Sequence, residues 1–259
     1  MKMRYCRGAL LAVLATVVSA ATASSVQAQG RTPIRACGQV VRHSAVLTRD
    51  LYCRGLPGVV VGAPGITIDL KGFTLRGDRT PGSYGIDDLR GYDGVTIENG
   101  LLRNFDYGLV GFAADRLVVS RVHASGNLGD GIFVAGAAAA VSASTSSGNG
   151  GDGIYVLGAS ADVRSTTASG NLGNGIYVSG VSAAIRWSVA SGNAHHGIAV
   201  SGDAAVVEGN RAEANGVAAG ASGLGGLGLD VFGYTRAPVG TNVAHGNDDS
   251  AQCRPASLC

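Results

Sequence analysis

The sequence has little that would build helices or flexible linkers. Beyond its first residues, no stretch keeps apolar side chains at the 3.6-residue period of an amphipathic helix over a helix length, so no long helix is expected. Proline is scarce, with 6 residues in 259, whereas glycine is abundant, with 42. Because Val, Ile and Leu are also plentiful, the composition is not that of a linker but of an ordered chain that turns often.

The chain also lacks an apolar run long enough to cross a membrane. The run ALLAVLATVVSAA (9–21) is shorter than the ~20 residues that a spanning helix needs. It follows Lys2, Arg4 and Arg7 and precedes a small-residue cleavage site, Val26-Gln27-Ala28, which is the order of a secretory signal peptide. We therefore predict a signal peptide at 1–28 and a secreted or periplasmic mature chain at 29–259, with no membrane span.

An excess of positive charge is missing as well. Without the leader, 17 basic residues face 18 acidic ones, which leaves a net charge of −1. A near-neutral chain lacks the basic surface with which proteins bind a phosphate backbone. This excludes nucleic acid as the expected partner.

The mature chain keeps four cysteines but has no CxxC spacing that would indicate zinc. They lie in two pairs near the ends: Cys37, Cys53, Cys253 and Cys259. An exported protein meets an oxidising compartment, which favours disulfides over free thiols. Of the three pairings that four cysteines allow, we favour Cys37–Cys53 with Cys253–Cys259.

What the sequence does have is a repeated phrase. It reads SGNLGDGIFVAG at 125–136, SGNGGDGIYVLG at 147–158 and SGNLGNGIYVSG at 169–180. The step of 22 residues carries one asparagine series: Asn127, Asn149, Asn171, Asn193 and Asn215. Related phrases are YGI (84–86), YGL (107–109) and, after a Gly/Ala-rich insertion around 216–226, GLDV (228–231).

The repeat predicts a β-solenoid. Apolar residues alternate in GIFV, GIYV and GIAV, which is typical of a strand, and a second strand is expected around Val141 or Val163 in each unit. A third strand per unit is less legible. Because a unit this small cannot bury its own apolar face, the units must stack, with about 8–9 coils of 22–23 residues. Stacked asparagines can then hydrogen-bond along the ladder, so we interpret the asparagine series as structural.

The Asn…Gly-Ile-x-Val repeat and the opening CGQVV…VLTRDLYCRG…VVVGAPGITIDLKGFTLRG resemble the right-handed parallel β-helix family over roughly 37–245. This is the fold of pectate lyases and of many secreted bacterial proteins of unknown role. The resemblance implies an all-β, single-stranded right-handed parallel β-helix, with end caps at about 37–61 and 246–259. It is weak evidence for function, because one fold hosts many activities.

Stacking would turn periodic positions into surface columns. The position just before each strand holds Tyr84, Tyr107, Asp130, Asp152, Asn174 and His196, and the outward strand position adds Phe133, Tyr155 and Tyr177. Together with His195, these aromatic and polar side chains are our candidate saccharide-binding surface. The alternative is structural, since cross-strand aromatic pairs stabilise sheets and Asp-Gly or Asn-Gly favours turns.

A catalytic role is a second hypothesis. The segment HHGIAV (195–200) resembles the Gly-His-Gly segment of polygalacturonases, which implies Asp130, Asp152 and His196 as catalytic residues. Asn174 in the intervening coil, and the absence of an adjacent Asp pair and of an Arg-x-Lys motif, depart from that family. Asp130 and Asp152 stand close enough in the stack for the pKa of one to rise, as general-acid catalysis requires.

Lyase and metal chemistry have less support. Arg164 and Arg186 form an outward pair, but the acids nearest them do not repeat, so we expect a surface ion-pair ladder rather than a calcium-dependent lyase site. Some periplasmic β-helix proteins that resemble this one take part in copper-site maturation. Copper prefers Cys and Met, and both methionines leave with the leader.

We therefore predict an exported, monomeric β-helix protein that binds a polysaccharide or another cell-envelope component without catalysis, cofactor or metal. A small polysaccharide hydrolase, lyase or epimerase and a copper-maturation protein are the alternatives.

Overall fold

The computed structural model describes residues 31–216, 226–233 and 241–259. Within it, Arg31–Cys259 forms one compact unit. The predicted signal peptide and most of the Gly/Ala-rich insertion lie outside the described residues. Among the described residues, no helix is long and apolar enough to cross a membrane.

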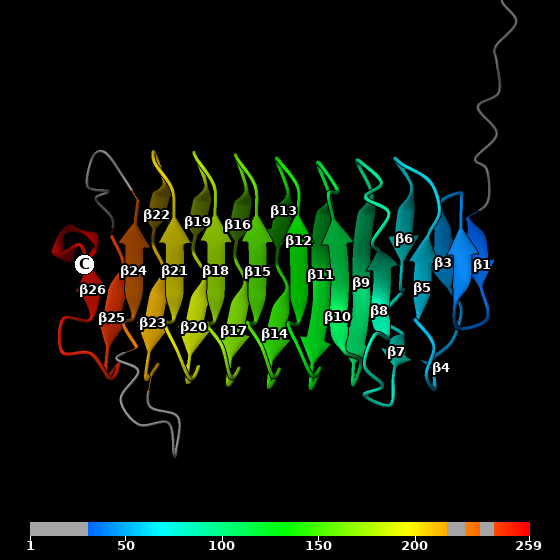
Figure 1. Ribbon diagram of the computed structural model, residues 1–259, viewed down its shortest axis with the longest axis horizontal. Coiled ribbons are helices and arrows are strands. Elements are labelled where there is room, and N and C mark those ends of the chain that lie inside the picture. Colours follow the sequence, from blue (N-terminus) through cyan, green and yellow to red (C-terminus); the bar gives the residue numbers. More distant parts are fainter. Residues whose placement is uncertain (1–30, 217–225, 234–240) are drawn as a thin grey trace, which may run out of the picture. The chain divides into compact units, whose positions relative to one another are not determined.

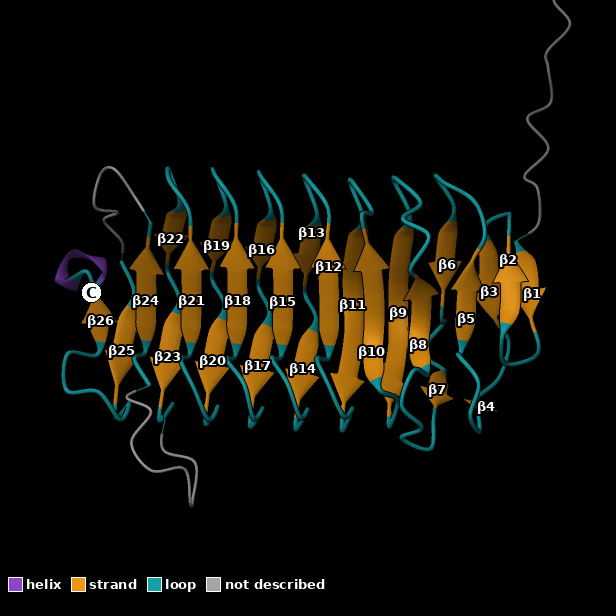
Figure 2. Ribbon diagram, viewed as in Figure 1, coloured by secondary structure: helices purple, strands orange, loops and turns teal. Residues whose placement is uncertain are grey.

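The described chain is a parallel β-solenoid of about nine turns, as the repeat predicted (Figure 1). Every strand pair is parallel, and equivalent positions of successive coils face each other, as in Ile132↔Ile154 and Ile154↔Ile176. Most regular coils contribute three strands, so the third strand that was hard to recognise in the sequence is present. Figure 2 shows the strands arranged in columns.

The first strand column is a ten-stranded sheet. Its members are β2 (Gln39–Val41), β5 (Val59–Val61), β8 (Tyr84–Asp88), β10 (Tyr107–Phe112), β12 (Ile132–Ala135), β15 (Ile154–Leu157), β18 (Ile176–Ser179), β21 (Ile198–Ser201), β24 (Leu229–Phe232) and β26 (Cys253–Arg254).

The second and third columns belong to one sixteen-stranded sheet, because two long strands, β9 (Thr96–Arg103) and β11 (Val118–Ser125), run through both. The second column also contains β1 (Thr32–Ile34), β3 (Ala45–Leu47), β6 (Thr67–Asp69), β13 (Ala140–Ser142), β16 (Asp162–Arg164), β19 (Ala184–Arg186) and β22 (Val206–Glu208). The third also contains β4 (Leu51–Tyr52), β7 (Thr74–Arg76), β14 (Thr145–Ser147), β17 (Thr167–Ser169), β20 (Val189–Ser191), β23 (Arg211–Glu213) and β25 (Val243–His245).

The core consists of the repeated apolar positions. The Ile and Val side chains of the repeat are fully buried, among them Ile132, Ile154, Ile176, Val134, Val156, Val178, Val141 and Val163. Because each coil buries its apolar face only against its neighbours, this column supplies the main driving force for stacking.

The asparagine series forms the structural ladder that the sequence predicted. The side-chain Nδ2 of Asn149 donates to Oδ1 of Asn171 at 2.9 Å, and Asn171 donates to Asn193 at the same distance. Backbone N–H groups of the series donate to the same oxygens, as in Asn149 to Asn171 at 3.1 Å. The ladder therefore satisfies buried polar groups at one turn of every coil.

The glycine just before each repeated strand is needed because there is no room for a side chain, and not because the backbone turns with positive φ. Gly153 and Gly175 are not among the residues with positive φ. A Cβ atom at Gly153 would stand 2.6 Å from Nδ2 of Asn171, so a larger residue would displace the asparagine ladder. Positive φ occurs instead at the turn glycines Gly148 and Gly170.

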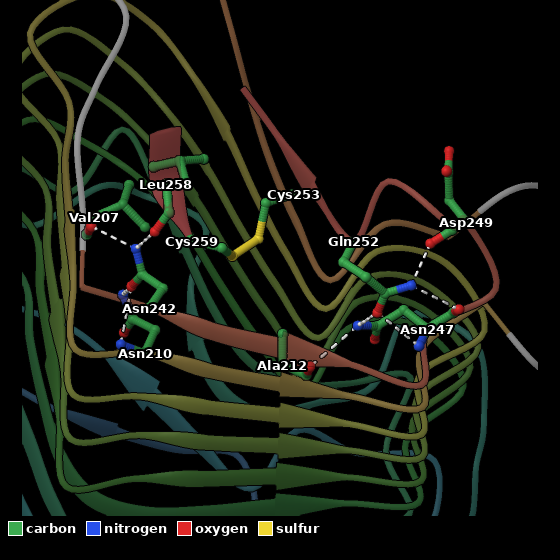
Figure 3. Close-up of a disulfide and its surroundings, with 10 residues drawn as sticks. All are labelled: Val207, Asn210, Ala212, Asn242, Asn247, Asp249, Gln252, Cys253, Leu258 and Cys259. Atoms are coloured by element: carbon green, nitrogen blue, oxygen red, sulfur yellow. Dashed lines mark hydrogen bonds between the residues drawn. A yellow bond between two sulfur atoms is a disulfide. The ribbon is translucent and has the colours of Figure 1, made fainter. Parts of the chain in front are cut away.

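Both ends of the described unit carry a disulfide. Cys37 is joined to Cys53, and Cys253 to Cys259. At the C-terminal end, the short 3₁₀ helix η1 (Ala256–Leu258) places the fully buried Leu258 against the last coil (Figure 3). The backbone oxygen of Leu258 accepts a 2.9 Å hydrogen bond from Nδ2 of Asn242. This segment thus covers apolar surface and occupies polar groups that the end of a stack would otherwise expose.

Candidate functional site

An aromatic stripe crosses five consecutive coils of the first strand column. We use this name for the rings that come from β8, β10, β12, β15 and β18: Tyr84, Tyr107, Phe133, Tyr155 and Tyr177. Successive ring centroids are 6.1, 6.3, 5.4 and 4.9 Å apart. The last three pairs are edge-to-face, with interplanar angles of 73–86°. All five side chains are half-buried, so the stripe is continuous and reaches the surface.

The tyrosines of the stripe keep their polar ends free. Among the described residues, none of the hydroxyl groups of Tyr84, Tyr107, Tyr155 and Tyr177 has a hydrogen-bond partner in the protein. Burial raises the pKa of Tyr155, and the neighbouring Tyr177 and Asp152 raise it further. Each hydroxyl can both donate and accept a hydrogen bond beside an apolar ring surface.

A polar ladder runs beside the stripe. We use this name for Asp130, Asp152, Asn174 and His196, which occupy one position of successive coils. Oδ1 of Asp130 accepts the backbone N–H of Asp152 at 2.7 Å, and Oδ1 of Asp152 accepts that of Asn174 at 2.6 Å. Oδ1 of Asn174 accepts the N–H of His196 at 3.1 Å. Each side chain thus fastens its own coil to the next.

Burial dominates the electrostatics of the two acids. It raises the pKa of Asp130 to about 7, and the charge of Asp152 acts in the same direction. Burial also raises the pKa of Asp152, while hydrogen bonds from Asn174 and the charge of His195 oppose that rise. Asp130 is 9% exposed. A carboxyl group with a pKa near neutrality can donate a proton, although one oxygen of each acid is already occupied by the backbone.

The structure places His196 with partners other than the two acids. Its Nδ1 accepts the backbone N–H of Leu227 at 3.0 Å, and its Nε2 lies 3.8 Å from Oδ2 of Asp230. Burial lowers the pKa of His196, while the charge of Asp230 acts against this. Asn174 stands between His196 and Asp152, two coils apart or ~10 Å by strand spacing. The neighbouring His195 is exposed.

Asp230 and Arg254 were not among the predicted site residues. Asp230 is 2% exposed and receives two hydrogen bonds from Arg254, of 2.9 and 2.7 Å. The signal was available, because Asp230 lies in GLDV, the last copy of the repeat, at the outward position that Ala199 holds one coil earlier. Since both ring nitrogens of His196 face protein partners, this cluster fastens the last coils together.

The remaining predicted residues divide between structure and surface. Arg164 and Arg186 both pair with Asp162, and Arg186 also pairs with Glu208, which makes the expected ion-pair ladder. All four mature cysteines are in disulfides. Among the described residues, no three His, Cys, Asp or Glu side chains are grouped so that they could hold a metal ion.

Comparison with known proteins agrees with the architecture. Residues 65–185 match the family model described as the right handed beta helix region. The chain is a right-handed parallel β-helix. This β-helix is similar to the crystal structure of pectate lyase Pel9A, with a TM-score of 0.44 and 15% identity over 85% of this chain and 70% of that chain.

It is also similar to the catalytic domain of a GH87 alpha-1,3-glucanase in complex with nigerose, with a TM-score of 0.42 and 12% identity. That match covers 85% of this chain and 56% of the glucanase domain. No curated protein matches this β-helix. At these identities the likeness concerns the fold alone, and the site has to be argued from its own residues.

Proposed function

We propose that this β-helix is a non-catalytic saccharide-binding module whose binding surface is the aromatic stripe. Two observations together support the proposal: five half-exposed rings pack in a continuous row, and four tyrosine hydroxyls have no hydrogen-bond partner among the described residues. Sugar rings have apolar faces and hydroxyl edges, so they need apolar and hydrogen-bonding surface side by side. Rings that pack against each other also lose little side-chain freedom on binding.

The polar ladder supports binding more than catalysis. Asp130, Asp152 and His196 each use an atom to hold the backbone of the following coil, and His196 faces Asp230 rather than the two acids. The second carboxylate oxygen of Asp130 and that of Asp152 can accept hydrogen bonds from sugar hydroxyls at the edge of the stripe. We therefore assign the ladder a structural role with a secondary part in ligand contact.

Binding is tested by affinity electrophoresis of the purified chain in gels that contain pectin, alginate, glucan or xylan. We expect retardation by at least one polysaccharide, and at least a tenfold loss of affinity in Tyr155→Ala, because its ring packs against the rings of Phe133 and Tyr177 on either side. The matched control is Trp187→Ala, which removes an aromatic ring that is 62% exposed outside the stripe. Equal losses in both variants would contradict the proposal.

A small carbohydrate-active enzyme is the second candidate, favoured by one observation. The pKa of Asp130, raised to about 7, suits a general acid next to a second carboxyl group. The same polysaccharides are incubated with the protein while unsaturated products and reducing ends are measured. If the protein turns over a polysaccharide, and this activity disappears in Asp130→Asn and Asp152→Asn while the fold stays intact, the function is catalysis rather than binding.

A further inference from the structure

Two arginine side chains, Arg54 and Arg76, flank Tyr52 on the third strand column, outside the aromatic stripe, and a third, Arg103, lies one coil beyond Arg76. Tyr52 of β4, Arg76 of β7 and Arg103 of β9 occupy one outward position in three successive coils. The guanidinium carbons of Arg54 and Arg76 lie 5.0 and 5.4 Å from the ring centroid of Tyr52. Such cation–π contacts hold the two guanidinium groups near each other and restrict their motion.

These arginines differ from the paired arginines of the second column. In the described part of the chain, the side chains of Arg54, Arg76 and Arg103 have neither an ion pair nor a hydrogen bond. By contrast, Arg164 and Arg186 contact carboxylates. Like charges at directly opposite positions of neighbouring strands destabilise a sheet, so Arg76 opposite Arg103 is an arrangement that a bound anion would relieve.

Two acids lie near the arginines, and both are engaged elsewhere. Oδ1 of Asp50 accepts the backbone N–H of Thr74 at 2.8 Å. Oδ1 of Asp78 accepts the backbone N–H of Gly55 at 3.2 Å and the hydroxyl of Thr80 at 2.7 Å. The two carboxylates reduce the local excess of positive charge. They do not accept hydrogen bonds from the guanidinium groups in the described part of the chain.

A hollow of about 310 Å³ adjoins the cluster, lined by Asp50, Leu51, Tyr52, Thr74, Arg76 and Arg103. This volume is at the lower end of the range of small-ligand pockets. Arg76 and Arg103 contribute two guanidinium groups to the lining. Leu51 and Tyr52 contribute apolar and aromatic surface, and Asp50 and Thr74 contribute a carboxylate and a hydroxyl. The lining therefore combines donors for an anion with apolar and polar surface for a ring that bears hydroxyls.

We propose that Arg76 and Arg103, beside Tyr52, form a binding site for an acidic sugar residue, with its carboxylate or sulfate held between the two guanidinium groups. Guanidinium groups bind such planar or tetrahedral oxyanions with paired, charge-assisted hydrogen bonds. The basic run ends after two coils, because the next outward positions of the column are Ser125 and Ser147. A compact anionic group fits this cluster better than the extended phosphate backbone of a nucleic acid.

The test measures binding of an oligogalacturonate to the purified chain by calorimetry, with a sulfated dextran, neutral dextran, inorganic phosphate and a DNA oligonucleotide as separate probes. We expect oligogalacturonate or sulfated dextran to bind more weakly as salt rises, and neutral dextran not to bind here. The first two probes distinguish a carboxylate from a sulfate as the bound group. The double variant Arg76→Gln with Arg103→Gln should weaken binding at least tenfold.

The control is Arg164→Gln with Arg186→Gln, which removes the same charge from paired side chains and should leave affinity unchanged. Equal weakening in both double variants, or tighter binding of phosphate or DNA at Arg76 and Arg103, would overturn the proposal. Tyr155→Ala should leave oligogalacturonate binding at this cluster intact. A failure of this site is thereby distinguishable from a failure of the aromatic stripe. All the substituted arginines are at the surface, and circular dichroism checks that the variants fold.

Discussion

The regular coils at 127–215 and the earlier coils at 51–103 differ in how completely their polar side chains are engaged by the protein. In the regular coils, Asn149 and Asn171 are 1% exposed and bond to the equivalent residue of the next coil. In the earlier coils, Arg76 and Arg103 point outward without a protein partner in the described chain. Charge follows the same division, with 12 basic and 9 acidic residues in 31–121 against 5 and 9 in 122–259.

This difference separates architecture from candidate function. A side chain that fastens one coil to the next is needed in every coil, so structural residues recur at the period of the fold. A ligand site is needed once. The residues that interrupt the repeat, such as the arginines around Tyr52, are therefore better functional candidates than Asp130 and Asp152, which continue a hydrogen-bonded ladder.

The largest effect is expected when the asparagine ladder of the regular coils is interrupted. Asn171→Ala would leave the buried backbone N–H of Asn149 without its acceptor and would remove the side-chain hydrogen bond from Asn171 to Asn193. Nδ2 of Asn149 keeps Oγ of Ser146 as a partner, and Oδ1 of Asn193 keeps the backbone N–H of residue 171. Because a buried unsatisfied group costs about 1–3 kcal/mol and a lost hydrogen bond about 0.5–1.5 kcal/mol, we expect the free energy of unfolding to fall by about 3 kcal/mol. Denaturant titration measures the change. Leu172→Ala, at a side chain that is 64% exposed in the same turn, should cost less than about 0.5 kcal/mol.

A smaller effect concerns the polar ladder and depends on pH. Since the pKa of Asp130 is raised to about 7, the folded state keeps a proton that the unfolded chain releases near pH 4. The carboxyl group's contribution to stability is therefore present at acid pH and lost as pH rises through about 7.

Asp130→Asn cannot ionise and keeps an oxygen for the N–H of Asp152, as Asn174 does two coils later. We expect this variant to match the wild type near pH 4 and to exceed its stability by on the order of 2 kcal/mol at about pH 8. Denaturant titrations at both pH values measure the difference. Parallel curves for the two proteins would exclude Asp130 as the source of the pH dependence.

The smallest effect on stability is expected at the arginines of the earlier coils. Arg76→Gln removes one of two like charges on adjacent strands and breaks no protein hydrogen bond, so the free energy of unfolding should change by less than about 0.5 kcal/mol. Thermal unfolding checks this prediction. A loss above about 1.5 kcal/mol would mean that Arg76 is structural and would remove the reason to regard it as a binding residue.

Much of the fold could be predicted, whereas the use of particular side chains could not. Spacing alone indicated the strands, the buried Ile and Val columns and the asparagine ladder, because each depends on a position that recurs every 22 residues. Spacing also grouped the aromatic stripe correctly on one column. It did not indicate that Asp130 would bond to the backbone of the next coil, since an Asp-Gly turn looks the same whether the acid faces solvent or its neighbour.

The sequence by itself determined that this chain stacks into a β-solenoid, because a 22-residue unit with one apolar face can bury it only against a copy of itself. Only the tertiary structure decided which polar side chains of the described residues have no protein partner and can contact a ligand. Asp230 receives Arg254 from the equivalent position of the next coil, and His196 receives the N–H of Leu227 across 31 residues, a step that spans the insertion in the sequence. Those contacts depend on where residues 226–233 and the last coil join the stack. The repeat therefore placed the aromatic stripe, whereas three-dimensional contacts decided which polar side chains were already engaged.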